Sequence, residues 1–505
     1  EIAQCLVGSE MCIRDSLLNY IYQIIKRTVL MKKLKSILCF TLGVCLITSP
    51  LLAHSTLVQT SPISSNSLHA LEIAMEELIL PRNLYILAGD LSTPSRLTLY
   101  DSNIVLSPSN HYTLTVSSKL GTRVLGRWFY EGTGISIPSS PFNLTVSLNT
   151  PTTSLTKEVS VEIIDRTDTT PVRLLAIGDS LTRMGKYVEH VQTILPNVET
   201  VGTITYEGEN FAREGRGGWT FNKYFNYIGC SEYLDSPFVF PASVSGNAYK
   251  GNTADWKKIC TAKSTDTTYS GLQKMARGWQ DAGPYLYDEK GYYKTPKLGD
   301  VMVDPSLPED KRWIEWDGTK WSPLAIQPTK FEINFTKYMD RFKQAYPTGA
   351  PTHISILLGA NDFGTHNTLM DMPGFLHYLE QFITSIHNYD PSIKVIICTP
   401  TLAPNIKLLT GDTSSYNRYN RNMKLATYYL LKAYDNDESI ARNIYIAPMT
   451  LTLDTTNGFD YKISQTKRDG LITTQVTAKN SIHPNEFGNI LMGNTLAAVI
   501  QKFRH

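Results

Sequence analysis

A serine stands directly after an apolar run, at the place where a buried strand would end. Residues 173–183 read RLLAIGDSLTR, so Ser180 follows an aliphatic segment that closes on Gly178 and Asp179. Such a run predicts a parallel strand, and in open α/β sheets sites assemble at the carboxyl ends of the strands. A hydroxyl held there is a candidate nucleophile. A single Gly-Asp-Ser string is more often a turn that caps a helix, so the prediction depends on partners elsewhere in the chain.

Three further strings follow in a fixed order along the chain. Residues 214–220 read EGRGGWT, residues 357–363 read LLGANDF, and residues 481–487 read SIHPNEF. With the serine segment, they resemble the four blocks of the SGNH hydrolases, also called the GDSL esterase and lipase family, which supply Ser, Gly, Asn and His in this order. The resemblance covers about residues 172–503. It implies an SGNH-type, flavodoxin-like α/β/α sandwich around a parallel sheet, with ester hydrolysis as its activity.

The resemblance implies a role for one residue of each block. Ser180 attacks the ester carbonyl, and His483 is the general base that takes its proton. The oxyanion hole consists of the backbone N–H groups of Ser180 and Gly218 and the side-chain amide of Asn361. Gly218 is preferred to the two other glycines of its block because it fits the family's GxxGxT spacing. The four blocks would therefore supply a nucleophile, a base and oxyanion donors.

The chain departs from the family pattern three residues before His483, where the usual acid is replaced by Asn480. An amide cannot stabilise an imidazolium as a carboxylate does, and an Asp to Asn change in a triad elsewhere lowers the rate roughly ten-thousandfold. Either a backbone carbonyl or the side-chain oxygen of Asn480 then orients the ring. A third alternative is a carboxylate from the preceding loop: Asp454, Asp460 or Asp469. We prefer a Ser-His dyad assisted by a carbonyl or by Asn480.

The elements that must position these residues follow from the pattern of apolar residues beyond the serine segment. Strands that alternate with helices predict a parallel α/β sandwich over residues 172–504. The predicted strands after the first are 198–204, 353–358, 394–398 and 443–447, and the predicted helices are 186–194, 335–346, 372–387, 416–434 and 487–503.

An insertion over residues 226–327 separates the second block from the third. It holds five of the seven Trp residues, and it is too long for a simple connection. Its aromatic residues shape a substrate cleft or pack a small subdomain, and the second is favoured for most of them. Cys230 and Cys260 both lie in it, and export would permit a disulfide between them. Cys398 is predicted to be a buried free thiol; no Cys/His spacing suits zinc, and we expect no metal or cofactor.

Residues 77–166 are predicted to form a separate β-sandwich of the immunoglobulin or fibronectin kind. Short alternating runs such as RLTLYDS, YTLTVSS and FNLTVSL are separated by Pro, Gly, Ser and Asn. Trp128 is favoured as the core aromatic residue, with exposure for stacking on a sugar as the alternative. Residues 54–76 are rich in Ser and Thr and are predicted to be an exposed linker.

Residues 31–53 have the basic start, apolar middle and small final residue of a secretory signal peptide. The alternative, a membrane anchor, is disfavoured because Thr48, Ser49 and Pro50 interrupt the run and leave it short for a span. We therefore expect a secreted, periplasmic or cell-surface protein without an integral membrane segment in its mature chain. Residues 1–30 are expected to be a non-native leader, because LVGSEMCIRDS looks like a translated sequencing-adapter read.

The charge composition argues against one class of protein, the nucleic-acid-binding proteins. The chain has 48 basic and 46 acidic side chains, and residues 1–53 hold six of the basic and three of the acidic ones. The mature chain is thus nearly neutral, without the clustered basic excess of a nucleic-acid-binding protein. The sequence does not determine the oligomeric state.

These observations predict a secreted serine esterase that removes acetyl or other acyl groups, with acylated carbohydrate as the substrate. A lipid esterase or a thioesterase with the same site is one alternative. A glycan-binding surface protein with decayed catalytic blocks is another, and Asn480 is the feature that allows it.

Overall fold

The computed structural model describes residues 75–89, 95–108, 111–132, 141–206, 208–225, 236–241, 301–303, 307–308, 310–311, 313–325, 331–364, 372–404 and 414–505. All of them belong to one compact unit, Ser64–His505. The leader, the signal peptide, most of the linker, most of the insertion, and both Cys230 and Cys260 lie outside the described residues. The sequence-based expectations for these segments therefore stay predictions.

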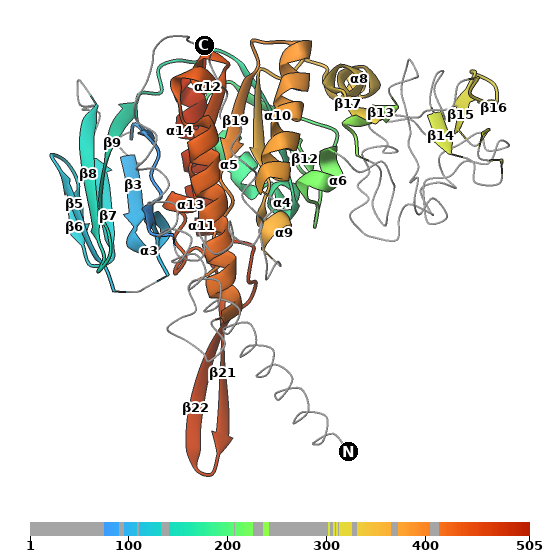
Figure 1. Cartoon of the computed structure of the whole chain (residues 1–505). Coiled ribbons are helices and arrows are strands. Elements are labelled where there is room, and N and C mark those ends of the chain that lie inside the picture. Colours follow the sequence, from blue (N-terminus) through green and yellow to red (C-terminus); the bar gives the residue numbers. More distant parts are fainter. Residues whose placement is uncertain are drawn as a thin grey trace, which may run out of the picture. The chain divides into compact units, whose positions relative to one another are not determined.

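A parallel sheet forms the centre of the unit (Figure 1). Its main strands lie in the order β11, β10, β18, β19 and β20, and the two-residue β12 pairs with the end of β10. The bounds are β10 (Val172–Gly178), β11 (Val198–Val201), β12 (Glu214–Gly215), β18 (His353–Leu357), β19 (Lys394–Cys398) and β20 (Ile444–Ala447). Without β12, the order along the chain is 2-1-3-4-5, a doubly wound arrangement. The predicted mixed α/β fold with a parallel sheet is confirmed, and its assignment to the SGNH type stays a prediction.

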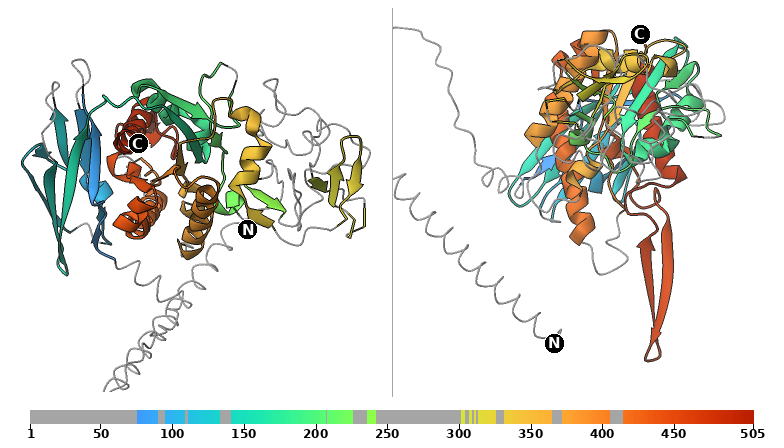
Figure 2. Two further views of the ribbon diagram at one scale, coloured as in Figure 1. Left: turned by 90° about the horizontal axis from the view of Figure 1, so that it is seen from above. Right: turned by 90° about the vertical axis from the view of Figure 1, so that its right-hand side faces the viewer.

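Helices pack against both faces of this sheet (Figure 2). Leu174 and Ala176 of β10 lie in one apolar cluster with α5 and α14, whereas Leu175 and Ile177 lie in a second cluster with α10 and α11. Because successive side chains of a strand point to opposite faces, the two clusters flank the sheet. The bounds are α5 (Lys186–Ile194), α10 (Met372–Tyr389), α11 (Ser414–Tyr434) and α14 (Glu486–Lys502). Cys398 is buried and free, as predicted.

One predicted helix is shorter than expected. The pattern over 335–346 forms α8 (Phe335–Arg341) and then a 3-10 turn (Lys343–Ala345). Tyr346, with φ −126° and ψ 56°, has left the helical region. The cause is Pro347, because a residue before proline is disfavoured in the α conformation.

Residues before β10 form antiparallel and mixed sheets. One has the order β2-β9-β8-β5, a second the order β3-β7-β6, and β1 pairs with β4. The bounds are β1 (Glu77–Leu78), β2 (Asn83–Leu87), β3 (Ser95–Tyr100), β4 (Val105–Leu106), β5 (Thr113–Ser118), β6 (Thr122–Val124), β7 (Arg127–Gly132), β8 (Phe142–Asn149) and β9 (Ser154–Ile164). Trp128 is only 2% exposed and packs near Phe142, so its predicted place in the core is confirmed. The immunoglobulin or fibronectin class of this region stays a prediction.

A buried polar contact ties this β region to the α/β region. Asn103, on the short helix α3 (Asp101–Ile104), is fully buried, and its Nδ2 donates to the carbonyl oxygens of Thr450 at 3.1 Å and Leu453 at 2.8 Å. Those carbonyls lie on and just after α13 (Met449–Thr452). A buried carbonyl left without a donor lowers the folding stability by about 1–3 kcal/mol. This contact therefore favours one fixed orientation of the two regions.

Candidate active site

Ser180 begins α4 (Ser180–Met184), and Asp179 is the one residue between it and the end of β10. Asp179 is the N-cap, and its Oδ1 accepts the N–H of Leu181 at 2.9 Å. Gly178 permits the turn, because a Cβ there would lie 2.0 Å from Oγ1 of Thr182. The turn therefore holds the Ser180 hydroxyl at the carboxyl edge of the sheet.

His483 meets Ser180 across 303 positions of sequence. Its Nε2 lies 2.7 Å from Oγ of Ser180, a hydrogen-bonding distance. The ring is carried by the loop that enters α14, where Asn485 is the N-cap and accepts the N–H of Gly488 at 3.0 Å. The structure thus brings the predicted nucleophile and the predicted base together.

Asn480 contacts the other ring nitrogen of His483. Its Oδ1 lies 3.0 Å from Nδ1, and the same atom accepts the backbone N–H groups of Ile482 and His483, each at 3.0 Å. Two N–H donors identify this atom as the amide oxygen, which can only accept. Nδ1 must then carry the proton, so the lone pair of Nε2 faces the Ser180 hydroxyl.

The three carboxylates considered as alternatives are engaged elsewhere. Asp454 accepts Tyr100 Oη at 2.9 Å and two N–H groups of its own loop, and Asp460 lies 3.4 Å from Nδ2 of Asn485. Asp469 lies at the far turn of a hairpin, 3.8 Å from Arg468. Of the alternatives left open by the sequence, the structure shows the contact from the side-chain oxygen of Asn480.

Asn361 lies on α9 (Ala360–Phe363), and its amide is already engaged. Its Nδ2 donates to Oδ2 of Asp179 and to the carbonyl of Trp219, both at 3.1 Å. An amide nitrogen has two hydrogens, so both are used within the protein. Asn361 therefore joins the serine turn to the glycine block in this structure.

Gly218 lies exposed on the turn of the second block, with φ 72°, a conformation that favours glycine. The block approaches the serine turn closely: Arg216 N–H donates to the carbonyl of Gly178 at 2.9 Å. At Gly215 a Cβ would lie 2.1 Å from the backbone nitrogen of Arg183. Gly215 thus permits the contact with α4, while Gly218 shapes the exposed turn.

Two carboxyl groups are buried under the site. Burial raises the pKa of Asp179 to about 7, and burial, with a smaller contribution from Asp179, raises the pKa of Asp362 to about 7. Asp362 Oδ1 accepts the N–H of Phe221 at 2.9 Å, while its Oδ2 has no hydrogen-bond partner within the described part of the chain. At neutral pH these groups together carry less than two full negative charges.

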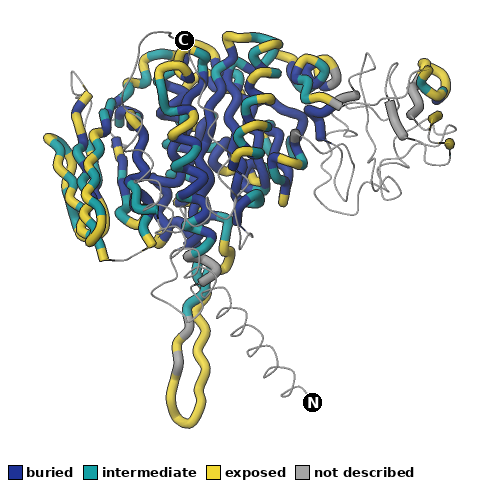
Figure 3. The backbone as a smooth tube through the Cα atoms, viewed as in Figure 1, coloured by how far each residue is buried: buried dark blue, intermediate teal, exposed yellow. Residues whose placement is uncertain are grey.

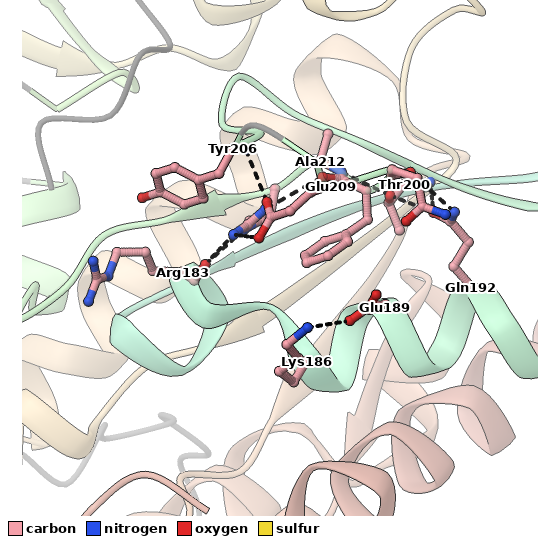
Figure 4. Close-up of polar contacts among 11 residues, drawn as sticks. Arg183, Lys186, Glu189, Gln192, Thr200, Tyr206, Glu209 and Ala212 are labelled. Atoms are coloured by element: carbon pink, nitrogen blue, oxygen red, sulfur yellow. Dashed lines mark hydrogen bonds and ion pairs between the residues drawn. The ribbon is translucent and has the colours of Figure 1, made fainter. Parts of the chain in front are cut away.

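Charged residues that sequence reasoning missed support the serine turn and the glycine block. Arg213 is 1% exposed; it pairs with Glu209, and its Nε donates to the carbonyl of Arg183 at 2.9 Å. Figure 4 labels these two partners, Glu209 and Arg183. Glu214 is fully buried and pairs with Arg216 at 2.6 Å. The EGRGG string was the only available signal, and charged residues are rarely buried without a partner.

A second missed element precedes Asn480. Strands β21 (Tyr461–Arg468) and β22 (Leu471–Ala478) form an antiparallel hairpin that projects from the unit and is mostly exposed (Figures 1 and 3). Its turn is Asp469-Gly470, both with positive φ. The Asp-Gly pair is by itself a hairpin-turn signal that could have identified it. The base is fixed where Lys479 N–H donates to the carbonyl of Asp460 at 2.8 Å.

No protein-family model matches the chain, and no curated protein matches it. Among solved structures, the chain is similar to a possible lipase from Chitinophaga pinensis, with 12% identity, 66% of this chain and 98% of that chain covered, and a TM-score of 0.28. It is also similar to a mutant of an acetyl esterase with an acetate ion, with 13% identity, 66% and 98% covered, and a TM-score of 0.29. Because both TM-scores are below 0.5, we derive the chemistry from the geometry of the site.

The described residues include neither a membrane-spanning helix nor a cluster of metal ligands. No helix among them has the length and apolar character needed to span a bilayer. Within the same residues, no group of His, Cys, Asp and Glu side chains is arranged to hold a metal ion.

Burial lowers the pKa of His483, and the nearby positive charge of Arg183 lowers it further. We predict that Arg183→Gln raises the pKa of His483, because one positive charge that opposes protonation is removed. The pKa stays below that of an exposed histidine, because the burial remains. An NMR titration of the ring measures both values. Arg468→Gln, at the exposed hairpin tip, is the matched control, and equal pKa values in the two variants would contradict the prediction.

Proposed function

We propose that this protein is a serine hydrolase of carboxylic esters, with Ser180 as the nucleophile and His483 as the general base. The observation that carries the proposal is the 2.7 Å contact between Oγ and Nε2, together with the tautomer that Asn480 imposes. A hydroxyl is a weak nucleophile at neutral pH and needs an adjacent base with a free lone pair. Both requirements are met at this contact.

The reaction would proceed in two halves. Oγ of Ser180 attacks the carbonyl carbon while Nε2 of His483 accepts its proton, and a tetrahedral oxyanion forms. The imidazolium then gives that proton to the alcohol oxygen as the ester C–O bond breaks, which leaves an acyl group on Ser180. Water repeats the sequence on the acyl-enzyme and releases the acid.

The proposed oxyanion donors are the backbone N–H groups of Ser180 and Gly218 and the amide of Asn361. The Asn361 amide has to give up one of its present acceptors to serve, and the carbonyl of Trp219 is the neutral one. The hydrogen bond to Asp179 would then keep the amide in place. Catalytic hydrogen bonds often tighten only when substrate is bound, so this exchange is compatible with the role.

The proposed substrate class is acetylated carbohydrate, and acylated lipid is the competing class. The predicted signal peptide, the β region before β10 and the aromatic insertion support carbohydrate. We predict the highest kcat/KM for the acetyl member of a series of p-nitrophenyl esters, falling as the acyl chain lengthens. Acetate release from a panel of acetylated polysaccharides then identifies the glycan. A preference for long acyl chains would remove the carbohydrate proposal and favour the lipid one.

We predict that Ser180→Ala abolishes labelling by a fluorophosphonate probe and lowers kcat for p-nitrophenyl acetate by a factor on the order of 10⁴ or more, because no acyl-enzyme can form. Ser117→Ala, at an exposed position on β5, is the matched control and should label as the parent does. Failure of the parent protein to label would favour the glycan-binding alternative, for which Asn480 is the specific observation.

Two substitutions of Asn480 are expected to change different features of the pH profile. Asn480→Ala removes the acceptor that fixes the tautomer, so kcat/KM should fall about 100-fold. Asn480→Asp places a carboxylate beside Nδ1–H, which stabilises the imidazolium and raises the pKa of His483. Because the base must be neutral, activity is present above this pKa and lost below it. The acid limb of the kcat/KM profile should therefore move to higher pH in Asn480→Asp.

Profiles of kcat/KM against pH measure both effects, and Asn149→Ala, at the exposed end of β8, is the control. An acid limb that stays in place in Asn480→Asp, with full activity in Asn480→Ala, would show that Asn480 does not position the ring.

A further inference from the structure

A cavity lies between the β region and α14, lined by residues that do not include Ser180 or His483. Its volume is about 670 Å³, which is within the range of about 300–1,000 Å³ typical of small-ligand sites. Figures 1 and 2 show the elements on its two sides, β3 and β7 on one and α14 on the other. We call this cavity the cleft; β3 and β7 form one of its walls and α14 forms the other.

One wall is the face of β3 and β7 that points away from the β core. On β3, Arg96, Thr98 and Tyr100 alternate with buried Leu97 and Leu99. On β7 the residues opposite them in register are Glu131, Phe129 and Arg127, respectively. Because side chains alternate along a strand, this whole polar and aromatic face is turned to the cleft.

The other wall is one side of α14. Phe487, Ile490, Leu491 and Asn494 line the cleft, and their i, i+3, i+4, i+7 spacing places them on a single helical face. Phe487 is 43% exposed, which is high for a large apolar side chain. The cleft thus combines an apolar helix face with a polar strand face.

The charges of the cleft are unevenly paired. Arg96 pairs with Glu131 at 3.0 Å, and Asp454 accepts the hydroxyl of Tyr100. Within the described part of the chain, Arg127 and Arg166 pair with no acidic side chain. Arg166 also has a buried Nε without a hydrogen-bond partner there. Arg127 hydrogen-bonds the side chain of Tyr100, and its Cζ lies 5.9 Å from the centroid of the Phe129 ring. The remaining N–H groups of Arg127 and the Nε of Arg166 are therefore the donors left in the cleft for an anion.

We propose that the cleft binds a carboxylate-bearing saccharide, such as a uronic acid unit of an acylated polysaccharide. A guanidinium donates two parallel hydrogen bonds to a carboxylate, which suits Arg127 and Arg166. The ring carbons of the sugar pack on the apolar faces of Phe129 and Phe487. An inorganic anion would use the charges but leave this apolar surface and most of the volume unfilled.

The link between the cleft and catalysis rests on the proposed function. Phe487 follows His483 by four residues, at the start of α14. Asn457 lines the cleft, and its carbonyl accepts Nδ2 of Asn485 at 2.9 Å, two residues from His483. A saccharide chain seated in the cleft therefore lies against the loops that carry the base. The cleft would select acidic polymers, while the serine acts on their acyl groups.

Calorimetry on the full mature chain with Ser180→Ala tests binding without hydrolysis. The probes are trigalacturonate, the neutral sugar xylotriose, and sodium sulfate, at one ionic strength. We expect trigalacturonate to bind and the other two to bind at least tenfold more weakly. Arg127→Gln with Arg166→Gln, added to this chain, should weaken trigalacturonate at least tenfold, whereas Arg468→Gln should not. Thermal unfolding of each variant confirms that the fold is retained.

Several outcomes would overturn the proposal: equal affinity for xylotriose, equal affinity for sulfate, or an unchanged affinity in the folded double variant. Sulfate binding alone would mean an adventitious ion only. Failure of the proposed function gives a different result from failure of the cleft proposal. In that case the parent protein does not hydrolyse p-nitrophenyl acetate, while the Ser180→Ala chain still binds trigalacturonate. An active parent whose Ser180→Ala form binds no trigalacturonate would remove the cleft proposal alone.

Discussion

The contact between His483 and Ser180 depends on the packing of α14 against α5. The serine turn leads into α4 and, after Gly185, into α5, and the base is carried on the loop that leads into α14. The hydroxyl and the ring therefore meet only if α5 and α14 are in register. Gly493 allows the close approach, because a Cβ there would lie 2.9 Å from the carbonyl of Tyr187. Asn494 adds a 2.9 Å hydrogen bond to His190. The geometry of the site is therefore a consequence of core packing, which is rigid on the scale of a bond length.

In the proposed mechanism, Asn480 performs only one of the two tasks that a triad aspartate performs together. It orients the ring and fixes the tautomer, yet it supplies no negative charge to the imidazolium. Burial and Arg183 act in the same direction and lower the pKa of His483. The expected base therefore stays neutral to a lower pH than an exposed histidine does, but it is weaker in proton abstraction than a carboxylate-paired histidine, and the rate would depend more heavily on the oxyanion donors.

The sequence predicted the parts of the molecule whose signals are local. Apolar runs identified β10, β18 and β19, helical spacing identified α10 and α14, and the motif resemblance selected Ser180 and His483. The hairpin of β21 and β22 escaped because it buries no face against a core, so its residues lack the apolar alternation that marks most strands. The burial of Glu214 and Arg213 also escaped, because it depends on partners brought close only by folding. The occupied amide of Asn361 is likewise a property of the assembled site.

The charge on the two buried acids, Asp179 and Asp362, affects how stable an oxyanion would be at this site. Asp179 accepts a hydrogen bond from Asn361, and Asp362 follows Asn361 directly, so both carboxyls lie beneath a proposed donor. Two full negative charges there would repel an oxyanion. Burial raises both pKa values to about 7, however, so at neutral pH part of that charge is already neutralised by protons. Asp179, with two hydrogen bonds, is the better placed to stay ionised, whereas Asp362 has one buried oxygen without a donor in the described residues and is the better placed to hold a proton. A protonated Asp362 would leave the single negative charge of Asp179, which accepts the hydrogen bond from Asn361, beneath the proposed donor.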